Sequence, residues 1–404
     1  MHPLTEDEID WIDAHFGDDI DRLRLRHHGD THLEWLIMQL YCRRKAATKL
    51  SSTLREKRFI FPTELSAEQC TSDAVARLHL PLLRQGGTLL DMTCGLGIDV
   101  FAAAGVCSHV TAIDIDPDVA EAAAVNAAAL GLGNITVVNA DSVEWLRNSD
   151  SHFDTIFIDP ARRGDKGRRL FALADCKPDI STNLDMVMVH CDRLVIKASP
   201  MLDISAVMDE LNMGCDIHII GTKDECKELV ITIPGDGRIT AQTVGHDQKL
   251  TFMRTDEERA EAKTGIPRQG DWLYEPNPAV VKGGAYKTVA ARFGITKIDT
   301  NVHLYHSANA ITTFPGTMMK VIEVIPFSKK AIKEVATRYH EISVTTKNFK
   351  MTPTQLSARL KNKESSSRRL FAVTASGQAL LIVTEREVNG AQTCGPSTAC
   401  LHVP

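Results

Sequence analysis

Four aspartates in the first half of the chain could take part in ligand binding, because each follows a short apolar run. They are Asp91, Asp114, Asp141 and Asp159. A loop with two glycines, Gly95 and Gly97, comes directly after the first of them. Carboxylates accept hydrogen bonds from hydroxyl and amino groups, and glycines let the backbone come close to a ligand. Together these residues predict a site for a nucleotide-like molecule.

The apolar runs before these acids predict parallel β-strands. We expect strands at 88–91, 109–114, 135–140 and 153–159, with helices at 100–105 and 117–130 between them. In an open α/β sheet the carboxyl ends of parallel strands lie at one edge, so the four acids should collect there. One acid at a strand end is usually a helix cap, but four at this spacing indicate a binding edge.

The glycine loop has three interpretations, of which a tight turn without a ligand is the simplest. A nicotinamide or flavin site would require G-x-G-x-x-G, and Val100 stands at the third glycine position. The last two expected strands of the sheet, 215–221 and 228–234, are joined by so short a loop that they must be antiparallel, whereas dinucleotide-binding sheets normally end in a parallel strand. A different nucleoside cofactor is therefore favoured. Asp114 follows the glycines by about 20 residues, which suits a carboxylate that binds the ribose of such a cofactor.

The motif D-x-T-x-G-x-G from Asp91 to Gly97, the later acids, and the D-P-A-R motif that begins at Asp159 resemble those of the class I S-adenosylmethionine-dependent methyltransferases. The resemblance covers residues 68–234. It implies an α/β fold with a Rossmann-like seven-stranded methyltransferase sheet whose last strand is antiparallel. It also implies S-adenosylmethionine as the cofactor.

The resemblance assigns roles to individual residues. The implied cofactor-binding set is Asp91, Thr93, Cys94, Gly95, Gly97, Asp114 and Asp141. Within it, Asp91 and the glycine backbone would hold the methionine end, Asp114 the ribose and Asp141 the adenine amine. Asp159, Pro160 and Arg162 form the implied catalytic set, beside the transferable methyl group. Residues 69–72 are expected to touch the cofactor, because the segment before the loop folds over it in related enzymes.

A basic, glycine-containing segment follows the expected catalytic aspartate. Its positively charged residues are Arg162, Arg163, Lys166, Arg168 and Arg169. A solvated surface loop is the plain interpretation of such a segment. Its place beside the expected active site favours a polyanionic substrate, because clustered positive charges attract phosphates. We therefore expect these residues to bind substrate, and RNA to be that substrate.

The atom that receives the methyl group can also be addressed from sequence. Families that methylate exocyclic amines usually carry D/N-P-P and then an aromatic residue, where this chain has Ala161 and Arg162. RNA uridine C5-methyltransferases end the same motif in D-P-P-R and attack the base with a cysteine after the next strand. Here Ser199 stands at that place, and a serine is too weak a nucleophile for the addition. Nitrogen methylation is therefore favoured, and the block 112–117 resembles that of RNA guanine-N2 methyltransferases.

The last third of the chain predicts a small α+β unit. Strands and helices alternate from residue 320 to residue 385. Together with the E-P-N-P-A-V-V-K-G-G stretch, 275–284, this tail resembles bacterial methyltransferases that carry a C-terminal THUMP-like domain. True THUMP domains bind RNA and usually precede the catalytic domain. A cluster that would suit an RNA backbone consists of Lys347, Lys350, Arg359, Lys361, Lys363, Arg368 and Arg369.

We expect four regions in the 404 residues, which are too many for a single core. They are an N-terminal helical region (1–80), a class I methyltransferase domain (81–235), a linking or ferredoxin-like region (236–319) and a THUMP-like α+β domain (320–395). A run of Lys and Arg at 43–58 has two interpretations. It is either a solvated helix face or a surface that contacts phosphates.

Composition excludes several classes of protein. Hydrophobic residues make up 43% and charged residues 24%, as in globular proteins, and the net charge of −6 argues against coating nucleic acid by bulk charge. The chain has no apolar run long enough to span a membrane, and residues 1–21 lack the layout of a signal peptide. We expect a cytoplasmic protein with no membrane partner. Without a C-x-x-C pair, the ten cysteines predict no metal site.

These features predict an S-adenosylmethionine-dependent methyltransferase that acts on a base nitrogen in structured RNA, such as tRNA or rRNA. One alternative is a catalytically silent protein that binds cofactor and RNA, suggested by the unusual Ala161-Arg162 pair. Another is a methyltransferase whose substrate is a protein or a small molecule. The oligomeric state does not follow from the sequence.

Overall fold

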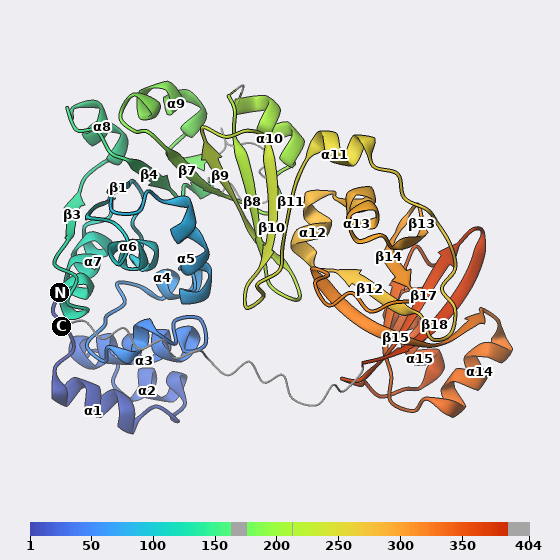
Figure 1. Cartoon of the computed structure of the whole chain (residues 1–404). Coiled ribbons are helices and arrows are strands. Elements are labelled where there is room, and N and C mark those ends of the chain that lie inside the picture. Colours follow the sequence, from blue (N-terminus) through green and yellow to red (C-terminus); the bar gives the residue numbers. More distant parts are fainter. Residues whose placement is uncertain (163–175, 212, 387–404) are drawn as a thin grey trace, which may run out of the picture. The chain divides into compact units, whose positions relative to one another are not determined.

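The computed structural model describes residues 1–162, 176–211 and 213–386, with side chains omitted at 161, 162, 176, 177 and 181. Two compact units make up the chain (Figure 1). The first holds residues 1–254 and 278–283, and the second holds 255–277 and the chain from 284 onward.

The first unit is built on a nine-stranded sheet with the order β11-β10-β8-β9-β7-β4-β1-β2-β3. Its strands are β1 (Thr88–Asp91), β2 (His109–Asp114), β3 (Ile135–Asn139), β4 (Thr155–Ile158), β7 (Leu194–Ala198), β8 (Asp216–Gly221), β9 (Cys226–Ile233), β10 (Arg238–Thr243) and β11 (Lys249–Met253). The five strands from β3 to β7 in this order are parallel, and β9 runs antiparallel to both of its neighbours. The predicted α/β class with an antiparallel strand is confirmed.

Two strands, β10 and β11, extend the sheet beyond the seven that the resemblance implied. They lie in the stretch expected to link two domains. Along β10 the buried residues Ile239, Ala241 and Thr243 alternate with more exposed ones. Because only one face of β10 is buried, its other face carries polar residues, and the stretch looked like a linker in the sequence.

Helices cover both faces of this sheet (Figure 1). They are α5 (Asp73–His79), α6 (Ile98–Ala104), α7 (Pro117–Ala129), α8 (Ser142–Arg147), α9 (Ile180–Val189), α10 (Ile204–Leu211) and α12 (Pro278–Gly283). One buried cluster joins α5 and α6 to strands β1, β2 and β4 through residues such as Ala76, Phe101, Leu89, Val110 and Phe157. The glycine loop between β1 and α6 is therefore anchored in the core at both ends.

The N-terminal region is helical and packs on the same core. Its helices are α1 (Glu6–Ala14), α2 (Ile20–Arg26), α3 (Thr31–Ala46) and α4 (Glu64–Gln69). Arg43 donates to the carbonyls of Lys57 and Phe59 at 2.7 and 2.5 Å, and Arg44 donates to the carbonyl of His15 at 2.8 Å. Arg43 and Arg44, at the start of the basic run, thus tie the helices together, and neither is a free surface charge.

The second unit contains one seven-stranded sheet with the order β13-β14-β12-β15-β18-β17-β16. Its strands are β12 (Trp272–Pro276), β13 (Thr296–Asp299), β14 (Val302–Ser307), β15 (Gly316–Pro326), β16 (Ser343–Lys347), β17 (Arg368–Ala375) and β18 (Gln378–Glu385), and its helices include α13 (Tyr286–Phe293), α14 (Lys329–Arg338) and α15 (Pro353–Leu360). Helices α14 and α15 pack together on one face through Val335, Leu356 and Leu370. The predicted C-terminal α+β fold is confirmed.

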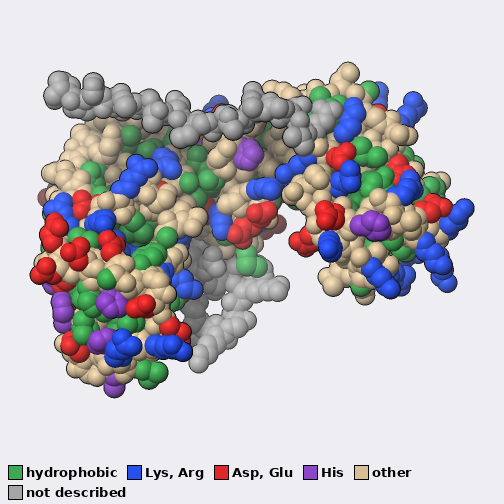
Figure 2. All heavy atoms as spheres, turned by 90° about the horizontal axis from the view of Figure 1, so that it is seen from below, with side chains coloured by type: hydrophobic (Ala, Val, Ile, Leu, Met, Phe, Trp, Pro, Cys, Tyr) green, Lys and Arg blue, Asp and Glu red, His purple; other side chains and the backbone are tan. Residues whose placement is uncertain are grey.

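Two surface properties of the described chain bear on function. Lys and Arg side chains stand out from the second unit on the face that Figure 2 shows. None of the helices in the described ranges has the length and apolar character needed to cross a membrane.

Candidate active site

The glycine loop adopts the backbone that its sequence requires. Gly95 and Gly97 have φ angles of +54° and +86°, in the left-handed region that glycine tolerates. A Cβ on Gly97 would lie 2.5 Å from the ring of Phe101, so this glycine serves helix packing. At Gly95 the nearest atom to such a Cβ would be the Thr93 carbonyl oxygen at 4.0 Å. The loop therefore faces open space at Gly95, where a ligand can approach the backbone.

The carboxylates at the ends of β2 and β3 hold backbone amides. Asp114 accepts hydrogen bonds from the amides of Gly95 at 2.8 Å and Asp116 at 3.0 Å. Asp141 is the N-cap of α8 and accepts from the amides of Val143 and Glu144. Each carboxylate keeps further acceptor positions for ligand hydroxyl or amino groups. Asp141 thus has the structural role that a single acid at a strand end suggests, while Asp114 fixes the glycine loop.

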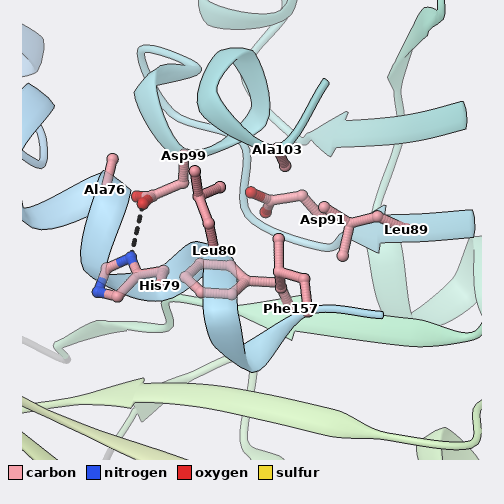
Figure 3. A pocket seen from close by; sticks show the side chains of 9 residues that line it. Ala76, His79, Leu80, Leu89, Asp91, Asp99, Ala103 and Phe157 are labelled. Atoms are coloured by element: carbon pink, nitrogen blue, oxygen red, sulfur yellow. Dashed lines mark hydrogen bonds and ion pairs between the residues drawn. The ribbon is translucent and has the colours of Figure 1, made fainter. Parts of the chain in front are cut away.

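Asp91 lies below the loop and is only 2% exposed. Its Oδ1 accepts the amide hydrogen of Thr93 at 2.8 Å. Burial is the main cause that raises the pKa of this carboxyl group to about 8, and the nearby Asp99 and Asp159 contribute to the same rise. Asp91, Asp99 and His79 border a cavity of about 10 Å³, which is close to the size of one water molecule (Figure 3).

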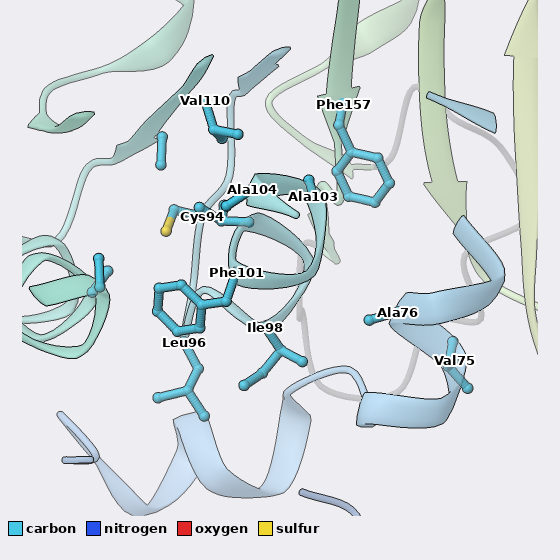
Figure 4. Packing of buried hydrophobic residues seen from close by; sticks show 14 of the residues in the cluster. Val75, Ala76, Cys94, Leu96, Ile98, Phe101, Ala103, Ala104, Val110 and Phe157 are labelled. Atoms are coloured by element: carbon cyan, nitrogen blue, oxygen red, sulfur yellow. The ribbon is translucent and has the colours of Figure 1, made fainter. Parts of the chain in front are cut away.

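Thr93 connects the glycine loop to Asp159, the expected catalytic residue. Its hydroxyl oxygen accepts the amide hydrogen of Asp159 at 2.7 Å, so the ends of β1 and β4 are fixed to each other. Next to it, the Cys94 side chain packs in the core (Figure 4). Burial raises the pKa of the Cys94 thiol well above its usual value, so this side chain is a packing residue and not a reactive thiol.

The structure places part of the expected catalytic and substrate set. Pro160 is buried directly after Asp159. The backbone of Arg162 lies in β5 (Ala161–Arg162), which pairs with β6 (Cys176–Lys177). The side chain of Arg162 and the whole of Arg163, Lys166, Arg168 and Arg169 lie outside the described residues.

A buried network of charged side chains surrounds Asp159, and motifs did not reveal it. The Lys197 ammonium donates to Asp159 Oδ2 at 2.6 Å and to the Thr71 hydroxyl at 2.8 Å. The Thr71 hydroxyl donates to Asp99 Oδ2 at 2.7 Å. The ring nitrogens of His79 contact Asp99 Oδ1 at 2.7 Å and Glu228 Oε1 at 2.5 Å.

The charges in this network stabilise one another. Burial lowers the pKa of His79, but Asp99 and Glu228 outweigh it and raise the pKa to about 9. Burial likewise raises the pKa of Asp99, and the cations His79 and Lys197 outweigh it, so that the pKa falls to about 2. Burial lowers the pKa of Lys197, and Asp159, Asp99 and Glu228 together move it above its usual value. His79 and Lys197 are therefore cations at neutral pH.

A sequence signal for this network existed but was weak. Lys197 is the one charged residue in the apolar strand L-V-I-K-A, and Glu228 lies beside the apolar run L-V-I-T-I. A charge in a buried strand must be paired, because an unpaired buried charge is costly. The identity of the partners could not be read from sequence, since Lys197 and Thr71 are 126 residues apart.

Three family models match the chain. A methyltransferase domain matches residues 89–163, a ferredoxin-like domain matches 272–315, and a THUMP domain-like model matches 316–386. The first match includes the glycine loop and the first four strand ends. The other two matches together cover the sheet of the second unit.

Individual proteins agree with these matches. An uncharacterized S-adenosylmethionine-dependent methyltransferase of Mycobacterium tuberculosis is 26% identical over 308 residues, which is 74% of this chain and 81% of the relative. An uncharacterized RNA methyltransferase of Mycoplasma mobile is 26% identical over 137 residues, 32% of this chain and 38% of the relative.

A crystal structure has the same fold along almost the whole chain. It is that of a provisionally assigned methyltransferase from Porphyromonas gingivalis W83, with 26% identity and a TM-score of 0.84 over 96% of this chain and 100% of the other. The fold, the site and these matches agree on one assignment. The chain carries a methyltransferase domain followed by ferredoxin-like and THUMP-like domains, and it is similar along most of its length to S-adenosylmethionine-dependent methyltransferases.

Proposed function

We propose that this methyltransferase binds S-adenosylmethionine across the glycine loop and methylates a nitrogen of a base in structured RNA. The observation that carries the proposal is the position of Asp159. Its amide is fixed by Thr93, its Oδ2 accepts from Lys197, and its side chain is 42% exposed. Within the ranges that the structure describes, Oδ1 makes no hydrogen bond, so it is available to accept one from an N–H group of the base to be methylated.

The strand ends fit the cofactor. Gly95 leaves open space above the loop, and Asp114 and Asp141 offer acceptors at the ends of the next two strands. Ile115, directly after Asp114, is 70% exposed and offers an apolar surface for a purine ring. When bound, S-adenosylmethionine supplies an electrophilic methyl group. The protein's main task is then to align the acceptor nitrogen, and Asp159 would hold it by a hydrogen bond and disperse the charge that develops.

Carbon-5 methylation has less support. Ser199, at the place where uridine C5-methyltransferases need a cysteine, accepts the amide hydrogen of Met201 at 3.3 Å and stands in a turn. A hydroxyl without an adjacent base is not activated for addition to a pyrimidine. We therefore retain a base nitrogen as the proposed acceptor.

The charge of the C-terminal domain supports an RNA substrate. Residues 316–386 contain 13 Lys and Arg against 5 Asp and Glu, a net charge of +8, although the whole chain has a net charge of −6. Some of the predicted cluster is internally paired, since Arg369 and Lys347 contact Glu275 and Arg368 contacts Glu385. The part of the chain that the structure describes shows no ion pair for Lys350, Arg359, Lys361 and Lys363. These four are the proposed phosphate contacts.

The relatives give this proposal further support. The THUMP domain-like match covers the basic region, and the Mycoplasma mobile relative is named an RNA methyltransferase. An RNA substrate would place the enzyme in the cytoplasm. The basic segment from Arg162 to Arg169 remains a predicted substrate contact beside Asp159.

Transfer of labelled methyl from S-adenosylmethionine into separate pools of total RNA and total protein tests the proposal. We expect label in RNA, lost in Asp159→Ala and retained in the control Asp192→Ala, whose wild-type side chain is 58% exposed before β7. Label in protein alone would contradict the RNA substrate. Donor binding without transfer to either pool would favour the catalytically silent alternative.

A further inference from the structure

Lys197 occupies an unusual position for a lysine. It lies in the central strand β7, and its side chain is 12% exposed. Its ammonium group contacts Asp159 Oδ2 at 2.6 Å, the Thr71 hydroxyl at 2.8 Å and Glu228 Oε2 at 3.8 Å. An ammonium has three hydrogens to donate and no acceptor, so the contacts with Asp159 and Thr71 are donations from Lys197, and the longer contact with Glu228 is an ion pair.

This requirement fixes the direction of the neighbouring hydrogen bonds. Because Lys197 can only donate, the Thr71 oxygen accepts from it, and the single hydroxyl hydrogen of Thr71 goes to Asp99 Oδ2. Asp99 stands in the first turn of α6, directly after the glycine loop. A chain of hydrogen bonds thus connects Asp99, in the helix behind the proposed S-adenosylmethionine site, with Asp159, the proposed contact of the base nitrogen.

Thr71 adds a third segment to this chain. It lies between α4 and α5, in the stretch expected to fold over the cofactor, and it is 9% exposed. Its hydroxyl is the single group that contacts both Lys197 and Asp99 along this path. The Thr71 hydroxyl and the Lys197 ammonium therefore connect three parts of the chain: the segment before α5, helix α6 and the end of β4.

We propose that Lys197 is a positioning residue for methyl transfer, which holds Asp159 Oδ2 so that Oδ1 faces the acceptor nitrogen. Thr71 assists by fixing the Lys197 ammonium relative to Asp99, in the helix that follows the glycine loop. This inference rests on the proposed function and adds a role for Lys197, which orients the Asp159 carboxylate that would hold the base nitrogen. Lys197 does not touch the reacting atoms.

The charges around Asp159 give the proposal a specific pH signature. Asp99 and Glu228 belong to the same network, and Lys197 is the cation that contacts Asp159. Without Lys197, Asp159 would lose the cation that lowers its pKa, while burial, Asp99 and Glu228 would still raise it. His79 would remain paired with Asp99 and Glu228, so Asp159 would take up a proton more readily. A protonated Asp159 cannot accept an N–H hydrogen bond equally well. Activity of such a variant should therefore rise as the pH is raised above neutral.

The test compares Lys197→Met, Lys197→Arg and Thr71→Val with the wild type. The matched control is Lys282→Met, since Lys282 is a partly buried lysine of the same unit that donates to the Leu202 carbonyl. We expect Lys197→Met to lower kcat for methyl transfer to total RNA by roughly 100-fold, with KM for RNA and the calorimetric Kd for S-adenosylmethionine within about threefold of wild type. Its activity should increase with pH, and Lys197→Arg should recover much of it.

A second readout does not need activity. A double-mutant cycle of Lys197→Met and Asp159→Ala in urea unfolding should be non-additive, because each substitution removes the same contact. Additive effects would overturn the inference even if the enzyme were inactive on the pools tested.

The outcomes separate the two proposals. Wild-type protein that transfers methyl while Lys197→Met and Thr71→Val behave like Lys282→Met would overturn the positioning role and leave the proposed function standing. Wild-type protein that transfers to neither RNA nor protein would overturn the proposed function, and the positioning role with it. If Lys197→Met does not fold, Lys197→Arg and Thr71→Val decide, since both keep a side chain of similar size.

Discussion

At the scale of single residues, the site keeps carboxyl groups where burial disfavours their charge. Asp91 is the clearest case, because it is 2% exposed and burial raises its pKa to about 8. At neutral pH the folded protein holds a proton on this group that the unfolded chain would release. This protonation makes the folded state progressively less stable as the pH rises from the usual pKa of 3.8 toward 8.

Asp91→Asn should therefore stabilise the protein and weaken donor binding. The amide can still accept the Thr93 hydrogen bond, and it cannot become the anion that the positively charged donor favours. We expect an unfolding free energy at neutral pH higher by at least about 1 kcal/mol. Affinity for S-adenosylmethionine, measured by calorimetry, should fall by roughly tenfold. A variant that is less stable yet binds the donor normally would show that Asp91 is purely structural.

His79 should also make the protein less stable as the pH rises, although here the folded state favours the charged form of the group. Its pKa in the folded protein, about 9, lies above the usual value of 6.5, because Asp99 and Glu228 favour its charged form. The stabilisation is complete below pH 6.5 and is lost as the pH rises through about 9. The shift corresponds to stabilisation on the order of 3 kcal/mol.

Urea unfolding across this pH range checks the role of His79. We expect His79→Gln to be less stable at the acidic end and to show a flatter pH profile than wild type. The control His109→Gln changes an exposed histidine at the start of β2 and should leave the profile unchanged. An unaltered slope in His79→Gln would contradict the assigned contacts.

At the scale of elements, the two glycines of the loop have different tasks. Gly97 begins α6 and lies against Phe101, whereas Gly95 faces open space at the end of β1. Gly97→Ala should mainly lower the melting temperature, because its Cβ would overlap the Phe101 ring. Gly95→Ala should cost only about 1 kcal/mol of stability for its left-handed backbone. It should weaken S-adenosylmethionine binding more than Gly97→Ala does. The reverse order of the two effects would place the ligand elsewhere.

The sequence predicted the features that lie within one short stretch. The loop from Asp91 to Gly97 and the acid at Asp114 could be located, because strand, turn and helix follow one another with fixed spacing. The network around Lys197 could not, because its members come from α5, α6, β7, β9, the segment before α5 and the end of β4, and meet only in the folded chain. The role of Asp141 as the N-cap of α8 could be identified only from the structure, because an acid at a strand end suits a helix cap and a ligand contact equally well.

At the scale of the whole molecule, charge is divided unevenly along the chain. The THUMP-like residues 316–386 have a net charge of +8 within a chain of net charge −6. Non-specific binding to an RNA backbone should therefore depend mostly on this domain. The net charge of the complete chain conceals the division, which is why composition alone gave no basic signal.

Charge reversal at two exposed lysines tests this division. Lys361→Glu with Lys363→Glu should lower RNA affinity by roughly tenfold at moderate salt and reduce the slope of log K against log salt by about 2. Binding of S-adenosylmethionine should not change. Lys223→Glu, in an exposed loop of the first unit, is the control and should have little effect on RNA binding. Equal effects of both substitutions would contradict a special role of the domain.

The most direct measurement of the central claim is mass spectrometry of nucleosides. RNA from cells that lack this enzyme would be incubated with the protein and S-adenosylmethionine carrying a deuterated methyl group, then digested to nucleosides. We predict a deuterated nucleoside methylated on a base nitrogen, which is missing with Asp159→Ala. Deuterium on pyrimidine carbon 5, or found in protein and not in RNA, would contradict the proposed function.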